Sequence, residues 1–331
     1  MKQPPILIIG KNGKTGSRVD RRLRALGHAT RPVSRSTRPA FDWNDPATWR
    51  PAIERTRAAY VTYQPDLAVP GAEATIKAFV QVATEAGLRH IVLLSGRGEQ
   101  GAERAEAILR TSGLAWNIIR ASWFCQNFSE SFMLDGILDG ELVLPAGDTV
   151  EPFVDADDIA DVAVAALTEP RHRNKLFEIT GPRALTFAQC IQEISQALGR
   201  RIEYTQVPID TYIEALQARG VPGDMQWLLR ELFTVVFDGR NNAGVNVPSS
   251  FQSPATSRSP GSPKMNWASA FPWVCELRKY TNPVDSRCRP AVSIPSPSKS
   301  PTNGWSPGVP NTYENSAAPR PWSPDPSLLM M

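Results

Sequence analysis

Short apolar runs alternate with amphipathic stretches along the first 241 or so residues of the chain. Runs of the length of a buried strand fall at residues 6–9, 29–34, 59–63, 90–94 and 116–119. Between them, apolar residues spaced three and four apart predict helices at residues 15–26, 72–86 and 102–111. Strands separated by helices indicate a parallel sheet with right-handed crossovers. Strands buried on both faces are apolar at every position, as residues 6–9 are.

The pattern is looser beyond Arg120. It predicts helices at residues 157–167, 186–198, 212–218 and 225–236, the second capped by Thr186, and strands at residues 175–179 and 201–205. We therefore expect an α/β fold with a Rossmann-like doubly wound parallel sheet over residues 1 to about 150. A small C-terminal α+β lobe, residues 151–241, is expected to pack over the edge of this sheet.

The composition of the chain changes at about Asn242. The last 90 residues hold 16 of the 30 prolines and a similar number of serines. Proline removes a backbone donor and fixes φ, so such segments hold neither a helix nor a central strand. We interpret residues 242–331 as a disordered Pro/Ser-rich tail. The abrupt loss of periodicity also suggests the hypothesis of a shifted reading frame, which resequencing across the junction would test.

Composition narrows the class of protein. The net charge is +3, the charged fraction is 21%, and basic residues are scattered among acidic ones, so nucleic-acid binding is not expected. No run of 18 apolar residues occurs, and the chain enters a strand directly without a signal-peptide pattern, so a cytoplasmic protein without membrane contact is expected. The four cysteines form no CxxC pair, which argues against a zinc site or a disulfide framework.

The strongest chemical signal is a glycine-rich turn that follows the first strand and opens the first helix. Gly10 suits the tight turn, Gly13 lets the backbone approach a pyrophosphate, and Gly16 lets the helix pack on the strand. A helix N-terminus offers free N–H groups and partial positive charge to phosphates. A plain surface turn is the alternative interpretation. The expected cofactor contacts in this turn are Gly10, Lys11, Asn12, Gly13, Lys14, Thr15 and Gly16.

The end of the second strand favours NADP(H) over NAD(H). An NAD-specific site usually places Asp or Glu there to bind the ribose 2′-hydroxyl. Here Arg35 stands between Ser34 and Ser36, and no acid is present in residues 30–36. A guanidinium and hydroxyl groups suit a 2′-phosphate. An ordinary solvated loop arginine is the alternative.

With these residues identified, the chain resembles the NmrA-like, atypical short-chain dehydrogenase/reductase family, and within it the ergot-alkaloid, festuclavine-dehydrogenase-like subgroup. The resemblance covers residues 5 to about 241. Its marks are residues 10–16, 34–35, 41–43, 95–96, 112–120, 124–128, 142–147 and 153–160. Ala121 departs from the family, which usually has proline after the arginine that corresponds to Arg120. The resemblance implies a dinucleotide-binding Rossmann-like domain with a smaller C-terminal lobe.

The catalytic pair of ordinary short-chain reductases is missing. Those enzymes use Tyr-x-x-x-Lys, whose tyrosine protonates the alkoxide, but residues 97–112 contain neither Tyr nor Lys. Glu103, Arg104 and Glu106 are expected on a solvated helix face. Hydride addition to an iminium carbon gives a neutral amine and needs no such acid. Reduction of a quinone or a flavin also depends less on an acid supplied by the protein.

The substrate pocket is expected beyond the carboxyl ends of the strands. Tyr63 and Ser95 stand at strand ends and are the catalytic candidates, and Ser95 is also a candidate cofactor contact. The expected lining residues are Tyr63, Trp123, Phe124 and Asn127. Two alternatives remain open: Ser95 caps a turn, and Phe124, Phe128 and Phe132 form the core face of a helix.

Two functions follow. The first is an NADP(H)-dependent oxidoreductase that transfers hydride to a small aromatic, iminium or quinone-like molecule. The second is a non-catalytic NADP-binding redox sensor that binds a protein partner. Asp155, Asp157 and Asp158 precede an apolar helix, so we interpret them as capping residues and expect no metal.

Overall fold

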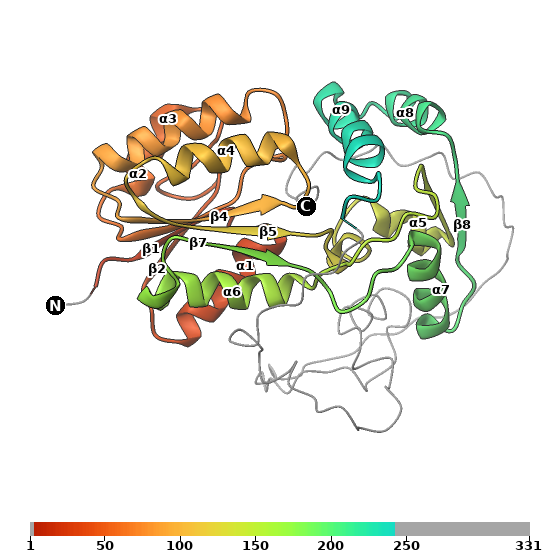
Figure 1. Ribbon diagram of the computed structural model, residues 1–331, viewed down its shortest axis with the longest axis horizontal. Helices are drawn as coiled ribbons and strands as arrows, with labels where there is room; N and C mark the ends of the chain where they lie inside the picture. The colour runs from red at the N-terminus through yellow and green to blue at the C-terminus, as the bar shows by residue number, and fades with distance from the viewer. Residues whose placement is uncertain (1–2, 242–331) are drawn as a thin grey trace, which may run out of the picture.

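The computed structural model describes residues 3–241, and the tail predicted at residues 242–331 lies outside this range (Figure 1). Six parallel strands form one sheet in the order β2-β1-β3-β4-β5-β7. Their bounds are β1 Ile6–Ile9, β2 Thr30–Val33, β3 Ala58–Val61, β4 His90–Gly96, β5 Ala115–Ala121 and β7 Lys175–Ile179. The predicted Rossmann-like parallel sheet is confirmed.

Helices cover both faces of the sheet because its strands present apolar side chains to both sides. Ile6 and Ile8 of β1 join the core shared with α1 (Lys14–Ala25) and α6 (Ala156–Thr168). The alternate residues Leu7 and Ile9 point to the opposite core. That second core is covered by α2 (Trp49–Ile53), α3 (Ala72–Glu85) and α4 (Gln100–Arg110), which lie above the sheet in Figure 1.

A smaller lobe stands beyond the carboxyl ends of the strands (Figure 1). Its elements are α5 (Met133–Asp139), β6 (Glu141–Leu144), α7 (Phe187–Leu198), β8 (Glu203–Gln206), α8 (Ile209–Ala218) and α9 (Gly223–Glu231). Strands β6 and β8 pair in parallel as a separate sheet. Its core is rich in aromatic rings, among them Phe128, Phe187 and Phe233. The α+β character expected of the lobe is thus present.

The sheet and the lobe are not consecutive segments, in contrast to the division expected near residue 150. Beyond that point, α6 still packs on α1 and β7 still pairs with β5 in the main sheet. Before it, α5 and β6 already belong to the lobe core. The chain therefore leaves the sheet after β5, returns for α6 and β7, and leaves again, which a reading of periodicity along the sequence does not show.

Other departures have local causes. The short elements α2, α5 and β6 were not expected from the periodicity. The helices α2 and α5 span only one or two turns, and the strand β6 spans four residues. Phe124 and Phe128 are core residues, as one alternative held, but no continuous helix carries them. Between them lies one turn of 3-10 helix, Cys125–Asn127, and the amide of Cys125 donates to the carbonyl of Val154 at 2.8 Å.

The capping interpretation of the acidic cluster is confirmed. Asp155 is the N-cap of α6, and its carboxylate accepts a hydrogen bond from the amide of Asp157 at 2.7 Å. Asp157 pairs with Arg22 at 2.7 Å, which ties α6 to α1. The cap predicted at Thr186 is also present, and the structure extends it to a capping box with Gln189 as the reciprocal partner. These contacts account for the positions of Asp155 and Asp157.

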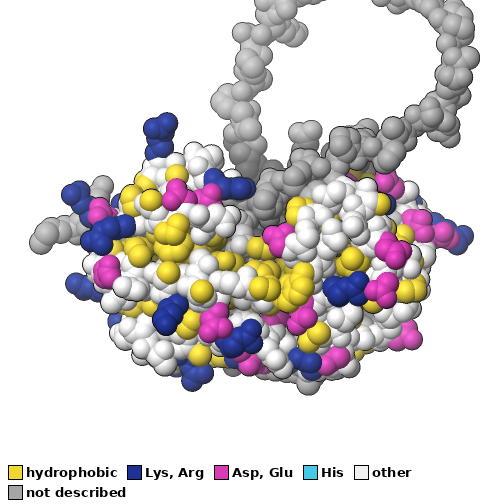
Figure 2. All heavy atoms as spheres, turned by 90° about the horizontal axis from the view of Figure 1, so that it is seen from above, with side chains coloured by type: hydrophobic (Ala, Val, Ile, Leu, Met, Phe, Trp, Pro, Cys, Tyr) yellow, Lys and Arg dark blue, Asp and Glu magenta, His cyan; other side chains and the backbone are white. Residues whose placement is uncertain are grey.

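Surface charge follows the composition. Figure 2 shows Lys and Arg side chains interspersed with Asp and Glu on the face that it presents. Within residues 3–241, no helix has both the length and the apolar content needed to cross a bilayer. Cys125 and Cys190, the cysteines in this range, are buried and form no disulfide.

Candidate functional site

The glycine turn connects β1 to α1 at the carboxyl edge of the parallel sheet. Gly10 has φ +85°, a conformation that favours glycine, and its carbonyl accepts from the amide of Gly13 at 2.9 Å. A Cβ at Gly16 would lie 2.2 Å from the carbonyl oxygen of Gly10. The first helix can therefore approach the strand this closely only with glycine at position 16.

The N-terminus of α1 is left open toward the turn. Gly13 is the N-cap and provides no side-chain cap, and no acid stands in the first turn. The amides there are oriented for an anion. Of the residues expected to contact a cofactor, Lys14 and Thr15 are buried behind the turn. Burial lowers the pKa of Lys14 to about 7, so its ammonium is not a fixed charge at neutral pH.

A cleft of about 450 Å³ runs from this turn to the end of β2. Four turn residues, Gly10 to Gly13, line one part of it, and Ser34, Arg35 and Ser36 line another. Arg35 is exposed, and the loop that carries it is held by the carbonyl of Ser34, which accepts from the amide of Phe41 at 3.0 Å. Pro222, Asp224 and Met225 reach the cleft from the lobe.

The shape and donors of this cleft fit a dinucleotide. The open helix N-terminus suits a pyrophosphate, and the exposed Arg35 lies where the end of β2 would meet the adenosine ribose. Sequence reasoning missed Asp42, which lines the same cleft although it does not follow β2 directly. Its Oδ1 accepts from the amide of Asn44 at 3.0 Å. The conspicuous Phe41-Asp42-Trp43 segment was the available signal.

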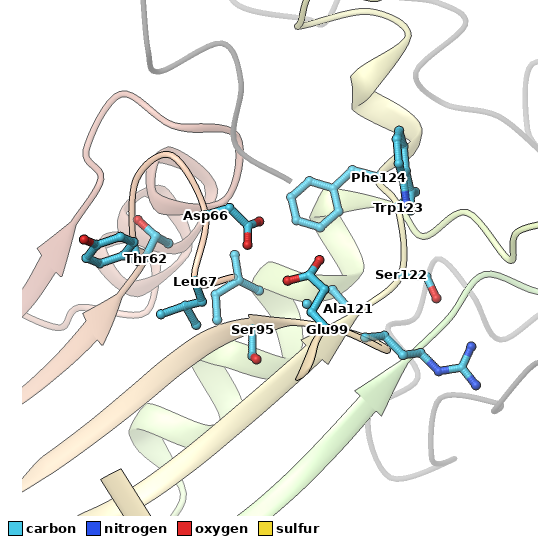
Figure 3. Close-up of a pocket in the computed structure, with 13 residues that line it drawn as sticks. Thr62, Asp66, Leu67, Ser95, Glu99, Ala121, Ser122, Trp123 and Phe124 are labelled. Atoms are coloured by element: carbon cyan, nitrogen blue, oxygen red, sulfur yellow. The ribbon is translucent and has the colours of Figure 1, made fainter. Parts of the chain in front are cut away.

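Ser95 belongs to a buried polar network. Its hydroxyl donates to Glu106 Oε1 at 2.6 Å, and Figure 3 shows it pointing away from the Asp66 and Glu99 carboxyl groups. Arg120 donates three hydrogen bonds to the same carboxylate: Nε to Oε1 at 2.9 Å and to Oε2 at 3.1 Å, and Nη2 to Oε2 at 2.7 Å. The expectation that Glu106 is solvated was wrong: its side chain is 1% exposed, because Arg120 on β5 neutralises it inside the fold.

A second, smaller cavity of about 30 Å³ lies where β3, β4 and β5 end (Figure 3). Tyr63, Trp123 and Phe124, three of the residues predicted to line a substrate pocket, line this cavity. Asn127 does not line either cavity and is buried, with its carbonyl accepting from Ser131 at 2.6 Å. Thr62 lines both cavities and so marks where they approach one another.

Trp123 also serves the core of the lobe. Its ring lies 5.4 Å from that of Phe187 and 5.2 Å from that of Phe233, between ring centroids. Tyr63 has a similar double role, because its ring lies 4.8 Å from that of Trp43 and is only partly buried. Both residues are thus held by aromatic packing while one side faces the cavity.

Two carboxyl groups in this cavity were not found from the sequence. Asp66 follows β3 and Glu99 precedes α4, and their carboxyl groups face one another in Figure 3. Burial, followed by the charge of Asp66, raises the pKa of Glu99 well above its ordinary 4.5. Burial also raises the pKa of Asp66. The residues stand 33 positions apart (99 − 66), so only the fold brings them together.

Comparison with known proteins found a matching family and several similar enzymes. Residues 102–256 match the model of the NmrA-like family, so the match extends past Asn241. The NAD(P)H azoreductase of Xenophilus azovorans is 28% identical over 255 residues, 70% of this chain and 86% of that enzyme. The agroclavine dehydrogenase of Claviceps fusiformis is 28% identical over 257 residues, 71% of this chain and 87% of that enzyme. These matches confirm the resemblance stated from the motifs.

A solved structure gives the same result for the fold. The Citrobacter sp. triphenylmethane reductase complexed with NADP(H) superimposes with a TM-score of 0.62 at 18% identity. The match covers 73% of this chain and 92% of that chain. Almost the whole of that fold therefore has a counterpart here.

Proposed function

Since residues 102–256 match the NmrA-like family and the fold is of the Rossmann type, we propose that this chain is an NADPH-dependent reductase of small, planar, electron-poor molecules. The observation that carries the proposal is the 450 Å³ cleft, which joins an uncapped helix N-terminus to Arg35. Backbone amides at Gly13 and beyond would hold the pyrophosphate, and Arg35 with Ser34 would hold a 2′-phosphate. When bound, the nicotinamide would supply the hydride.

The carboxyl ends of β3, β4 and β5 supply a place for the acceptor. Tyr63, Trp123 and Phe124 give the cavity aromatic walls that suit a flat substrate, including a cationic one. Similarity to an azoreductase supports azo acceptors, similarity to a clavine dehydrogenase supports small organic acceptors more widely, and we include iminium and quinone-like compounds in the proposed class. Hydride can reduce each of these acceptors without the tyrosine that ordinary short-chain reductases use to stabilise an alkoxide.

Cofactor titration of the full chain tests the nucleotide assignment. We expect NADPH to bind more tightly than NADH, and Arg35→Ala to weaken NADPH binding about 10- to 100-fold, since a charge-assisted contact contributes about 1.5–3 kcal/mol. NADH binding should change little. Arg38→Ala is the matched control, because Arg38 is exposed in the same loop but does not line the cleft. Equal affinities of the unchanged chain for NADPH and NADH would refute the 2′-phosphate assignment.

The second candidate is a non-catalytic NADP sensor with a protein partner. Residues 97–112 contain neither the Tyr nor the Lys of ordinary short-chain reductases, which favours this candidate. Oxidation of NADPH measured against imines, quinones and azo dyes separates the two functions. Turnover with any of these classes supports the reductase, whereas tight NADPH binding with no turnover across the panel supports the sensor.

A further inference from the structure

We propose that Asp66 and Glu99 share one proton and that this pair donates it to the acceptor after hydride transfer. The proposal rests on the reductase function above and adds the acid that the missing Tyr-x-x-x-Lys pair leaves unassigned. It also narrows the substrate class, because such a donor is useful only to acceptors that gain a proton together with the hydride, such as quinones and azo compounds.

The first step of the argument is the position of Glu99. Glu99 is the N-cap of α4, where an acidic side chain ordinarily accepts from the first helical amides. It makes no such cap, and its carboxyl group turns instead into the small cavity. A Cβ at Gly96 would lie 2.1 Å from the Glu99 carboxyl carbon, so the glycine leaves the space that the Glu99 carboxyl group occupies, and a larger residue would make that side chain move.

The second step is hydrogen bonding. Glu99 is 3% exposed, and within residues 3–241 its Oε2 meets no hydrogen-bond donor. A buried carboxylate oxygen without a donor is strongly unfavourable in its ionised form. Asp66 is 7% exposed, and its Oδ1 accepts from the amide of Ala68 at 2.7 Å. A proton on Glu99 that is donated to Asp66 satisfies both groups, so the pair is expected to hold one proton and one negative charge.

The third step is the charge around the pair. The charged groups that act on Glu99 are Asp66, Glu106 and Glu151, and all three disfavour its ionisation. Glu106 is already neutralised by Arg120. Arg97 lines the cavity, but its guanidinium points to the carbonyl of Asn241 at 2.8 Å and to Glu178 at 3.4 Å. Within residues 3–241, Arg120 and Arg97 are thus engaged with groups other than Asp66 and Glu99.

The fourth step is the route to the substrate. The cavity of about 30 Å³ has room for a water molecule beside the pair, and it approaches the cofactor cleft at Thr62. Hydride brings two electrons to the acceptor, and the resulting lone pair on oxygen or nitrogen takes a proton through that water. The O–H bond of the carboxylic acid breaks, both carboxyls are then anionic, and solvent restores the proton. NADPH is oxidised and the acceptor is reduced by two electrons.

The shared proton can be tested in the absence of cofactor and substrate. Infrared absorption of protonated carboxyl groups is recorded in the full chain at pH 8, above the pKa values of about 7 for Glu151 and about 6 for Asp158. A protonated-carboxyl band should persist there and should be missing in Glu99→Gln. Glu73→Gln is the control, because Glu73 is exposed on α3 and pairs with Arg104. Absence of the band in the unchanged chain overturns the proposal.

The donor role is tested by comparing two acceptor classes. Glu99→Gln should slow quinone or azo reduction about a hundredfold or more, as loss of a general acid does. Reduction of a cationic iminium or triphenylmethane dye, which needs no proton, should keep its rate, and NADPH affinity should not change. Equal losses with both classes, or no loss with quinones, reject the donor role. If the unchanged chain fails to bind NADPH, the proposed function fails, while the infrared band still decides whether the proton is shared.

Discussion

Replacement of Gly16 by alanine should damage both the stability of the fold and its cofactor site. The added Cβ would lie 2.2 Å from the Gly10 carbonyl oxygen, about 1.2 Å closer than the 3.4 Å at which ordinary contacts begin. The obstacle is backbone and not the end of a flexible side chain. Either α1 or the turn must therefore move, and that carbonyl also accepts from the amide of Gly13.

Overpacking of this kind costs about 1–3 kcal/mol. For a domain of roughly 150–250 residues, each kcal/mol lowers the midpoint of thermal unfolding by about 2–4 °C, so a fall of about 2–12 °C is expected. Displacement of the turn also moves the helix amides away from the position in which they would bind a pyrophosphate. We expect the NADPH dissociation constant to rise at least about tenfold, which corresponds to about 1.4 kcal/mol.

Thermal unfolding followed by circular dichroism and NADPH titration by fluorescence measure the two effects. Gly223→Ala is the matched control, because Gly223 is the first residue of α9 and its added Cβ would meet no atom within 4 Å. That variant should be as stable as the unchanged chain or slightly more so. If Gly16→Ala kept both the unfolding midpoint and the NADPH affinity, the close approach of α1 to β1 would be refuted.

Three further predictions concern stability. Asp155→Ala removes the cap of α6 and should lower the free energy of unfolding by about 0.5–2 kcal/mol in a denaturant titration, whereas Asp148→Ala in an exposed loop should not. Arg120→Met leaves the buried Glu106 carboxylate unpaired and should cost about 3–5 kcal/mol by the same measurement, and a loss under 1 kcal/mol would contradict the buried ion pair. Burial raises the pKa of Glu151 from 4.5 to about 7, so the folded chain keeps a proton that the unfolded chain has lost. Stability should therefore fall from about pH 4.5 to pH 7, by up to about 1.4 kcal/mol per pH unit, and Glu151→Gln should remove this component of the slope.

The sequence alone determined the sheet and its phosphate turn because local patterns of residues specify both. Apolar runs at residues 6–9 and 90–94 predicted buried parallel strands, and the structure has β1 and β4 there. Glycines at positions 10, 13 and 16 predicted a strand-to-helix turn, since the backbone conformation and close packing required there exclude a side chain. Capping by Asp155 and Thr186 was predictable for the same reason, because a cap bonds to amides two or three residues away.

Only the tertiary structure decided which acids are buried and what they face. Glu106 follows the helical pattern of a solvated residue, yet Arg120 from a neighbouring strand makes its burial favourable. Asp66 and Glu99 are unremarkable in sequence, and their proximity comes from two loops that end adjacent strands. Likewise, α6 and β7 return to the sheet after the chain has entered the lobe. The physical reason is the same in each case: local patterns specify backbone conformation, whereas the environment of a charge depends on segments distant in the chain.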